Sequence, residues 1–147
     1  MKTFWNEGDR QELRDRLARL SPESRAQWGR MDAPRMVVHL CDGFRMASGE
    51  LVCASKNLPI RFTPIKQLFI YVLPFPKSAP TAPELLARQP GAWSTDVQDL
   101  CTAMDRVVSC GPTGCAAEHP AFGKMTGKGW GVLAYSHMDH HLKQFGL

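Results

Sequence analysis

Residues 130–145 read WGVLAYSHMDHHLKQF, and they give the clearest indication of the architecture in this chain. Apolar and aromatic side chains recur every three or four residues, which is the spacing of one face of an α-helix. We therefore predict a helix that starts near Thr126 and ends at Phe145, with Gly146 as its C-terminal stop. Its inward stripe consists of Trp130, Leu133, Ala134, His137, His141 and Phe145. Two histidines thus share a face with core residues.

Three earlier segments show the same periodicity. Residues 9–20 place three leucines on one face, and Ser21 with Pro22 begins a turn after them. A second helix is expected from Asp32 to about Glu50, and a third from roughly Ser94 to Ser109. Their apolar positions are Met36, Leu40, Phe44 and Ala47 in the second helix, and Val97, Leu100, Cys101, Met104 and Val108 in the third. Gly43 in the second helix would allow a neighbour to approach closely.

Residues 51–93 differ in composition from the helical segments. They contain seven prolines, and from Leu51 to Pro83 there are four Lys or Arg and no acidic residue. We interpret them as a long connection with short helices near Ile65–Leu73 and Pro83–Ala87, and residues 110–123 as a loop. No segment alternates like a strand. The prediction is one all-α domain over residues 1–147, a four-helix bundle with a long Pro-rich connection between helices 2 and 3.

The composition excludes some classes of protein. The 147 residues are 44% hydrophobic and 22% charged, which excludes a disordered chain, and a net charge of +4 is too small to indicate nucleic acid or a membrane as partner. The five cysteines form no CxxC pair, and the N-terminal segment lacks the apolar core of a signal peptide. The longest apolar run, Leu68 to Leu73, is too short to span a bilayer. We expect a soluble cytoplasmic protein with reduced thiols.

His137 and His141 are four residues apart, so both side chains leave the same face of the last helix, one turn apart. That spacing allows both to bind one metal ion. His39 follows Met36 by three residues and also points toward the interior, which makes it the natural third ligand. Three neutral imidazoles leave a coordination position open, as in catalytic metal sites. The alternative is that these are core histidines hydrogen-bonded to the backbone.

The segment GWGVLAYSHMDHHLKQFG, taken together with HLCDGFRM after PRMVV, resembles the DinB/YfiT-like metalloenzyme superfamily, and more narrowly a branch known only as a domain of unknown function. The superfamily motif H-x-x-H-H-R-G-Q is matched from His137 to Gln144, with Leu142 and Lys143 in place of Arg and Gly. The resemblance implies a bacterial up-down-down-up bundle in which His39, His137 and His141 bind a divalent metal. His140 would only flank the site.

The resemblance also implies a reaction class, hydrolysis or thiol transfer on a small molecule, without choosing between them. Zinc or nickel is favoured by an all-nitrogen site, and iron, cobalt or manganese is compatible with it. Asp42, Asp139 and Gln144 are candidates to orient the ligand rings. The rival hypothesis is a non-catalytic module for ligand binding or dimerisation, with a structural or vestigial metal site. Exposed Phe69, Ile70, Tyr71 and Phe75 could form a homodimer interface or could cover the core.

Three other candidate motifs lack residues or spacings that their chemistry requires. Residues 123–128 are one residue short of a P-loop and lack its Ser or Thr. Cys110, Cys115 and His119 lack a fourth metal ligand, so reduced loop cysteines are the better interpretation. No Glu follows His137, so the metalloprotease motif HExxH is absent. Neither nucleic acid nor a membrane is expected as a partner.

Overall fold

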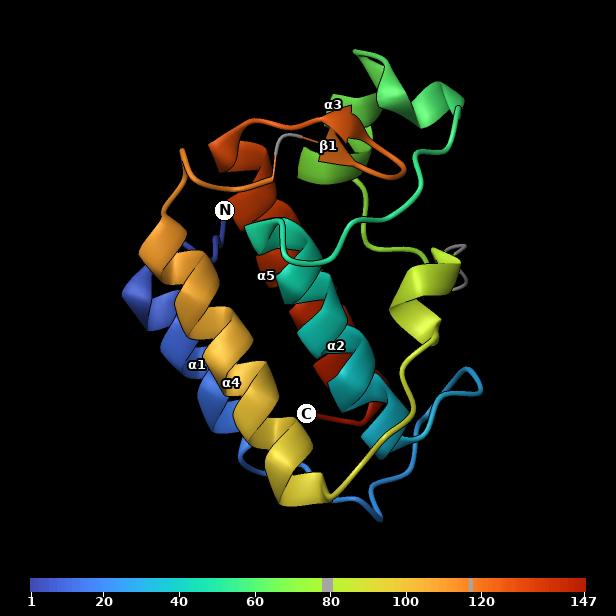
Figure 1. Ribbon diagram of the computed structural model, residues 1–147, viewed down its shortest axis with the longest axis vertical. Helices are drawn as coiled ribbons and strands as arrows, with labels where there is room; N and C mark the ends of the chain where they lie inside the picture. Colours follow the sequence, from blue (N-terminus) through green and yellow to red (C-terminus); the bar gives the residue numbers. More distant parts are fainter. Residues whose placement is uncertain (78–80, 117) are drawn as a thin grey trace.

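The computed structural model describes residues 1–77, 81–116 and 118–147, and these are mostly helical (Figure 1). The helices and strands found there are α1 (Glu7–Leu17), α2 (Ala33–Ser48), α3 (Ile65–Tyr71), α4 (Trp93–Cys110), α5 (Gly127–Gln144), the short 3-10 helices η1 (Pro59–Arg61) and η2 (Pro83–Leu86), and the strands β1 (Glu118–His119) and β2 (Gly123–Lys124).

Side-chain caps fix where three of the long helices begin. The side chains of Asn6, Asp32 and Thr126 each accept a hydrogen bond from a backbone N–H in the first turn of α1, α2 and α5. The other end of α2 is set by Gly49, whose φ of 85° lies in the left-handed region that glycine adopts without strain.

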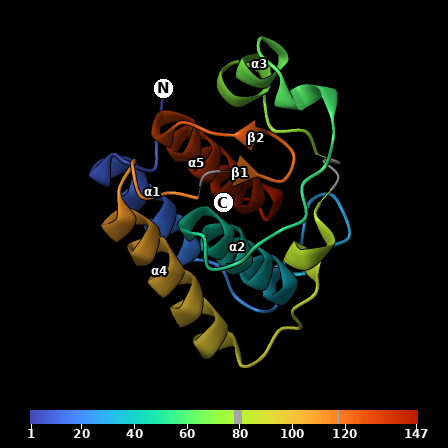
Figure 2. The ribbon, with the colours of Figure 1, turned by 45° about the horizontal axis from the view of Figure 1, so that its top comes forward.

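Helix α5 packs against several other elements. It contacts α1, α2 and α3, while α2 also packs along α4; in Figure 1, α5 passes behind α2, and Figure 2 shows the same helices from another side. Met138 and Leu142 of α5 are fully buried although they lie outside the predicted apolar stripe. Because α5 has neighbours on several sides, it buries more than the single face that its periodicity indicates.

The predicted helices are confirmed, with ends that differ by a few residues. Helix α1 begins two residues before the predicted segment and ends at Leu17, and residues 21–24 form a turn. The expectation that residues 110–123 contain no strand is wrong, because β1 and β2 pair as an antiparallel hairpin. Strands of two residues are too short to show alternation, so no sequence pattern predicts them.

The long connection joins this hairpin at one end of the molecule. Arg61 donates hydrogen bonds to the carbonyls of Lys56 and Pro120, and the Lys56 backbone N–H also donates to Pro120. Of the residues suggested for a dimer interface, Ile70 is buried and Phe75 packs against His137, so these two cover the interior. Within the described residues, no helix combines the length and the apolar character needed to cross a membrane.

Candidate metal centre

Three histidines meet where α2 packs against α5. His39 projects from α2, and His137 and His141 project from successive turns of α5. The ring centroids are 4.9 Å apart in each of the three pairs. One nitrogen from each ring can be chosen so that all three lie within 4.8 Å of one another. The structure thus brings together residues that are far apart in the sequence.

The ring of His39 is held by the long connection. Its Nδ1 lies 3.2 Å from the carbonyl oxygen of Leu85, a buried residue of η2. A carbonyl oxygen only accepts hydrogen bonds, so the Nδ1 carries the proton and the Nε2 keeps its lone pair. That Nε2 lies 2.9 Å from the Nε2 of His137.

The ring of His141 is held by the end of its own helix. Its Nδ1 lies 2.9 Å from the Oε1 of Gln144, and the Nε2 of Gln144 donates to the Trp28 carbonyl at 2.8 Å. Because the amide nitrogen is committed to Trp28, its oxygen must face His141 and accept from it. His141 therefore also presents a free Nε2 lone pair.

The ring of His137 is positioned by a small residue and by an aromatic one. A Cβ added at Gly43 of α2 would lie 3.4 Å from its Cε1, in ordinary van der Waals contact, so only a side chain larger than that of Ala would crowd the ring. The ring of Phe75 stacks on His137 with a centroid distance of 5.4 Å and an interplanar angle of 23°. Phe75 also contacts His140, and it forms an apolar wall over this side of the cluster.

The cluster is electrostatically suited to neutral imidazole. Burial is the largest cause that lowers the pKa of all three rings, and it takes the pKa of His141 to about 3. The neighbouring histidines lower the pKa of His137 and His141 further, because one charged ring opposes a second. Near neutral pH the three rings are therefore uncharged, which is the form that binds a metal.

The donor set and spacing fit one divalent ion. Bonds of about 2.0–2.1 Å from a metal to imidazole nitrogen place two such nitrogens at most about 4.2 Å apart. Nitrogens within 4.8 Å of one another reach that range with a small rotation of one ring. Three buried or half-buried histidines could thus hold a metal ion.

Among the three residues predicted to orient the rings, only Gln144 does so. Asp42 instead accepts hydrogen bonds from Arg88 at 3.2 Å and from Arg45 at 3.3 Å. Asp139 is likewise occupied, because Arg16 and Lys143 both donate to it at 2.8 Å. Both carboxylates face cations rather than imidazole, which is the stronger pairing for a partly buried charge.

The remaining histidines and loop cysteines are outside the cluster. His140 packs against Trp28 and Phe75 and beside the ring of His141. The Nδ1 of His119 accepts hydrogen bonds from the backbone N–H groups of Ala121 and Phe122, so this ring shapes the hairpin turn. Cys110 and Cys115 are free thiols, and burial raises the pKa of Cys115 to about 11.

Two contributors to the site are not predicted from the sequence. The Leu85 carbonyl is a backbone group, and nothing in the side-chain pattern marks it. Phe75 is predicted only as part of an interface or as a cover for the core, although its position between Pro74 and Pro76 indicates a rigid, extended segment that presents one ring.

Comparison of the chain with known proteins and protein families finds one matching family. A search of curated proteins and a search of solved structures each find no match to this chain. The model of the protein family of unknown function DUF1569 matches residues 9–146, a range that includes all three clustered histidines and Gln144. Since that match covers nearly the whole chain, the protein belongs to the DUF1569 family.

Proposed function

We propose that this protein is a DinB-like metalloenzyme that binds one divalent ion through His39, His137 and His141 and acts on a small molecule by hydrolysis or thiol transfer. The proposal includes a four-helix arrangement of α1, α2, α4 and α5 in up-down-down-up order. The observation that carries it is the shared orientation of two rings, His39 and His141, whose Nδ1 protons are bound by the Leu85 carbonyl and Gln144. In metal sites, such contacts to the non-binding nitrogen hold a ligand ring in place.

Each residue has a definite part in this proposal. A divalent ion held by three neutral imidazoles would supply a Lewis acid with open coordination positions. His39 and His141 would keep their lone pairs directed at one point, and Gly43 leaves room for His137 to join them. Phe75 restricts water on the outer side of His137 and offers an apolar surface to a bound substrate. Zinc and nickel are the metals we expect first, with iron, cobalt and manganese as compatible alternatives.

A second candidate function is a non-catalytic helical module in which the metal stabilises the fold. One observation favours it: among the described residues, no carboxylate forms an ion pair with any of the three rings, and Asp42 and Asp139 are paired with cations. A metal-dependent hydrolase often uses such a carboxylate as a general base. Within the catalytic proposal, the same observation counts against hydrolysis more than against thiol transfer, because a metal-bound thiol would lose its proton without a carboxylate base.

Elemental analysis of protein purified without a His tag tests the proposal. We expect about one equivalent of divalent metal per chain in the wild type and a large loss in the His137→Ala and His141→Ala variants. His140→Ala is the matched control, because it removes a histidine from the same helix without removing a proposed ligand, and it should keep its metal. Equal metal contents in all four proteins would reject the site.

Activity assays distinguish a metalloenzyme from a non-catalytic module with a structural metal. If the site is catalytic, the metal-loaded protein should turn over ester or thiol-transfer substrates, and His137→Ala should abolish that activity. If the metal is structural, a chelator should lower the melting temperature sharply and no substrate should be turned over with any metal.

A further inference from the structure

The outward face of α3 is apolar. Ile65, Leu68, Phe69 and Val72 follow the i, i+3, i+4, i+7 spacing of a single helix face, and all four are exposed, Val72 to 70%. A stripe of this kind normally faces a protein core. Here the core side of α3 is formed by Ile70, which is 7% exposed. The stripe is therefore a surface that α3 presents to the outside.

Two more residues extend this stripe. Phe62, just before α3, is 64% exposed, and Leu73, just after it, is also exposed. In Figures 1 and 2, α3 and the neighbouring η1 project at one end of the molecule, beyond the ends of α2 and α5. We call the exposed residues of this region the apolar tip; they are Phe62, Ile65, Leu68, Phe69, Val72 and Leu73.

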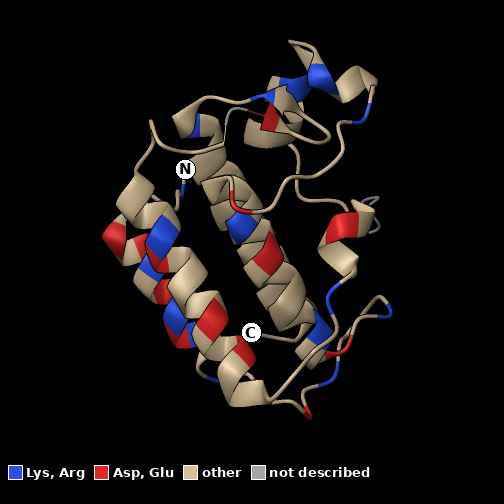
Figure 3. Cartoon of the chain, in the orientation of Figure 1, with Lys and Arg blue, Asp and Glu red and all other residues tan. Residues whose placement is uncertain are grey.

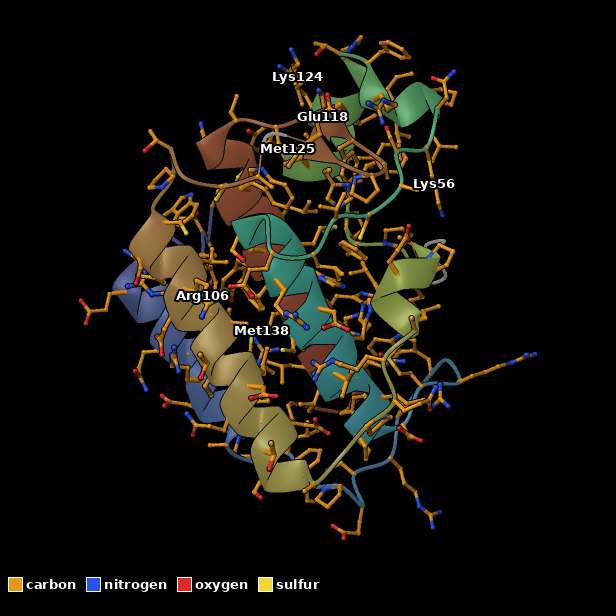
Figure 4. All side chains as sticks on the ribbon, in the orientation of Figure 1. Lys56, Arg106, Glu118, Lys124, Met125 and Met138 are labelled. Carbon is orange, nitrogen blue, oxygen red and sulfur yellow. The ribbon has the colours of Figure 1, made fainter. Side chains whose placement is uncertain are left out.

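Cationic side chains border the apolar tip. The Nζ of Lys66 donates to the backbone carbonyl of Lys124, and the Nζ of Lys128 lies 5.8 Å from the centre of the Tyr71 ring. Lys124 and Lys128 are exposed, and Figure 4 shows Lys124 at the same end of the molecule as α3. These contacts place three lysines on or beside α3, the helix that carries the tip.

Acidic groups are scarce at this end. No Asp or Glu occurs from Leu51 to Pro83, and in Figure 3 the region around α3 carries blue segments with little red. The nearby carboxylate of Glu118 lies 3.6 Å from the Arg61 guanidinium, so its charge is paired. The apolar tip is thus set in a surface of positive charge.

A second copy of this chain fits the tip poorly. A helix of seven residues is only about 10 Å long, which offers far less than the roughly 800 Å² per partner that a stable interface buries. A two-fold contact through the tip would also bring the lysines of one copy toward those of the other. A partner that is negatively charged and broad, and that needs no matching shape, fits better.

We propose that the apolar tip inserts into the interfacial region of a membrane containing anionic lipids, with Lys66, Lys124 and Lys128 at the level of the headgroups. Exposed aromatic and aliphatic side chains enter the boundary between headgroups and acyl chains, and neighbouring lysines are attracted to the negative surface. The proposed binding is peripheral, and it differs from the expectation from composition that a membrane is not a partner. The net charge of the whole chain does not indicate this surface, because it includes the acidic residues that lie outside residues 51–83.

Co-sedimentation with vesicles tests this proposal and does not depend on the metal site. Full-length protein is mixed with phosphatidylcholine vesicles, with or without phosphatidylserine, at low and at high salt. We expect binding to the phosphatidylserine vesicles at low salt, with weaker binding at high salt and to phosphatidylcholine alone. Phe69→Ser combined with Val72→Ser should lower the partition coefficient by on the order of tenfold or more.

Matched variants separate the tip from general effects of hydrophobicity and charge. Val52→Ser removes an apolar side chain that is even more exposed, outside the tip, and should bind like the wild type. Lys124→Glu with Lys128→Glu should weaken binding, whereas Arg19→Glu with Arg25→Glu changes the net charge equally, at other exposed positions, and should have a smaller effect. Circular dichroism checks that every variant is folded.

Two results would overturn the proposal. One is the absence of vesicle binding, or binding that the tip variants and their controls share equally. The other is a concentration-dependent dimer, measured by light scattering, that Phe69→Ser with Val72→Ser abolishes, because the tip would then be an interface between two copies.

Discussion

The Nε2 atoms of His39 and His137 lie 2.9 Å apart, although 98 residues separate them in the chain. The Leu85 carbonyl holds the proton of His39 on Nδ1, so the Nε2 of His39 accepts and the Nε2 of His137 donates in this contact. For both Nε2 atoms to bind one metal ion, the neutral His137 ring would carry its proton on Nδ1 instead. The contact is therefore a direct measure of how closely the fold brings two proposed ligands together before any ion is bound.

Replacing Gln144 should weaken metal binding without removing a ligand. Gln144→Ala frees the His141 ring and also removes the hydrogen bond to the Trp28 carbonyl. Loss of a group that orients a ligand typically costs 10- to 100-fold in metal affinity, so we expect a decrease of roughly that size. Competition with a fluorescent chelator measures it, and Gln98→Ala, an exposed change on α4, is the control. An unchanged affinity in Gln144→Ala would show that His141 does not depend on this amide.

The sequence predicts where the helices lie and which three histidines come together, because both depend largely on local patterns. Helical periodicity is a local property, and His137 and His141 are oriented by their spacing within one helix. His39 is predicted as the third ligand because its place on the apolar face of its helix and the family resemblance both indicate it.

The groups around the cluster depend on long-range packing, which no local pattern contains. Asp42 was a candidate to orient His39 because it follows by less than one turn, yet Arg88 from the long connection binds it instead. Leu85 contributes only its backbone, and its position is set by how η2 packs against α2. The sequence thus identifies the three proposed ligands, which lie on helix faces, but it does not identify the contacts made by the connection.

Removing the Phe75 ring should speed the release of bound metal. Phe75 stacks on His137 and contacts His140, so Phe75→Ala uncovers one side of the cluster. Aromatic pairs contribute roughly 0.5–1.5 kcal/mol, which corresponds to a release rate about two- to tenfold higher. Transfer of metal to excess chelator, followed by absorbance, gives the rate. Phe69→Ala removes an exposed ring from the same connection and should leave the rate unchanged; equal rates in both variants contradict a covering role for Phe75.

The free protein should become less stable as the pH falls below about 6.5. Burial lowers the folded-state pKa of His141 to about 3 and of His119 to about 4, and it lowers the pKa of His137 and His39 as well. These histidines take up protons at about pH 6.5 only after unfolding, so their contribution to stability is complete above that pH and is lost below it.

For each histidine that is charged only in the unfolded state, the free energy of unfolding falls by about 1.4 kcal/mol for every unit by which the pH decreases below about 6.5. Urea unfolding of metal-free protein from about pH 7 to pH 5 measures this slope. His141→Ala should reduce the slope by the contribution of one proton. A free energy of unfolding that is constant over this range would contradict neutral, buried histidines in the folded state.

Alanine should be tolerated at Gly43, whereas a larger side chain should not. A Cβ at this position would lie 3.4 Å from Cε1 and 3.5 Å from Nδ1 of His137, which is ordinary van der Waals contact. Because Gly43 lies inside α2, Gly43→Ala should raise the free energy of unfolding by about 0.5–1 kcal/mol through helix propensity, with metal binding retained. Gly43→Val adds two methyl groups against the His137 ring and should weaken metal binding while the protein stays folded. Chemical unfolding and metal titration of both variants distinguish these effects, and loss of the metal in Gly43→Ala would mean that His137 approaches α2 more closely when the ion is bound.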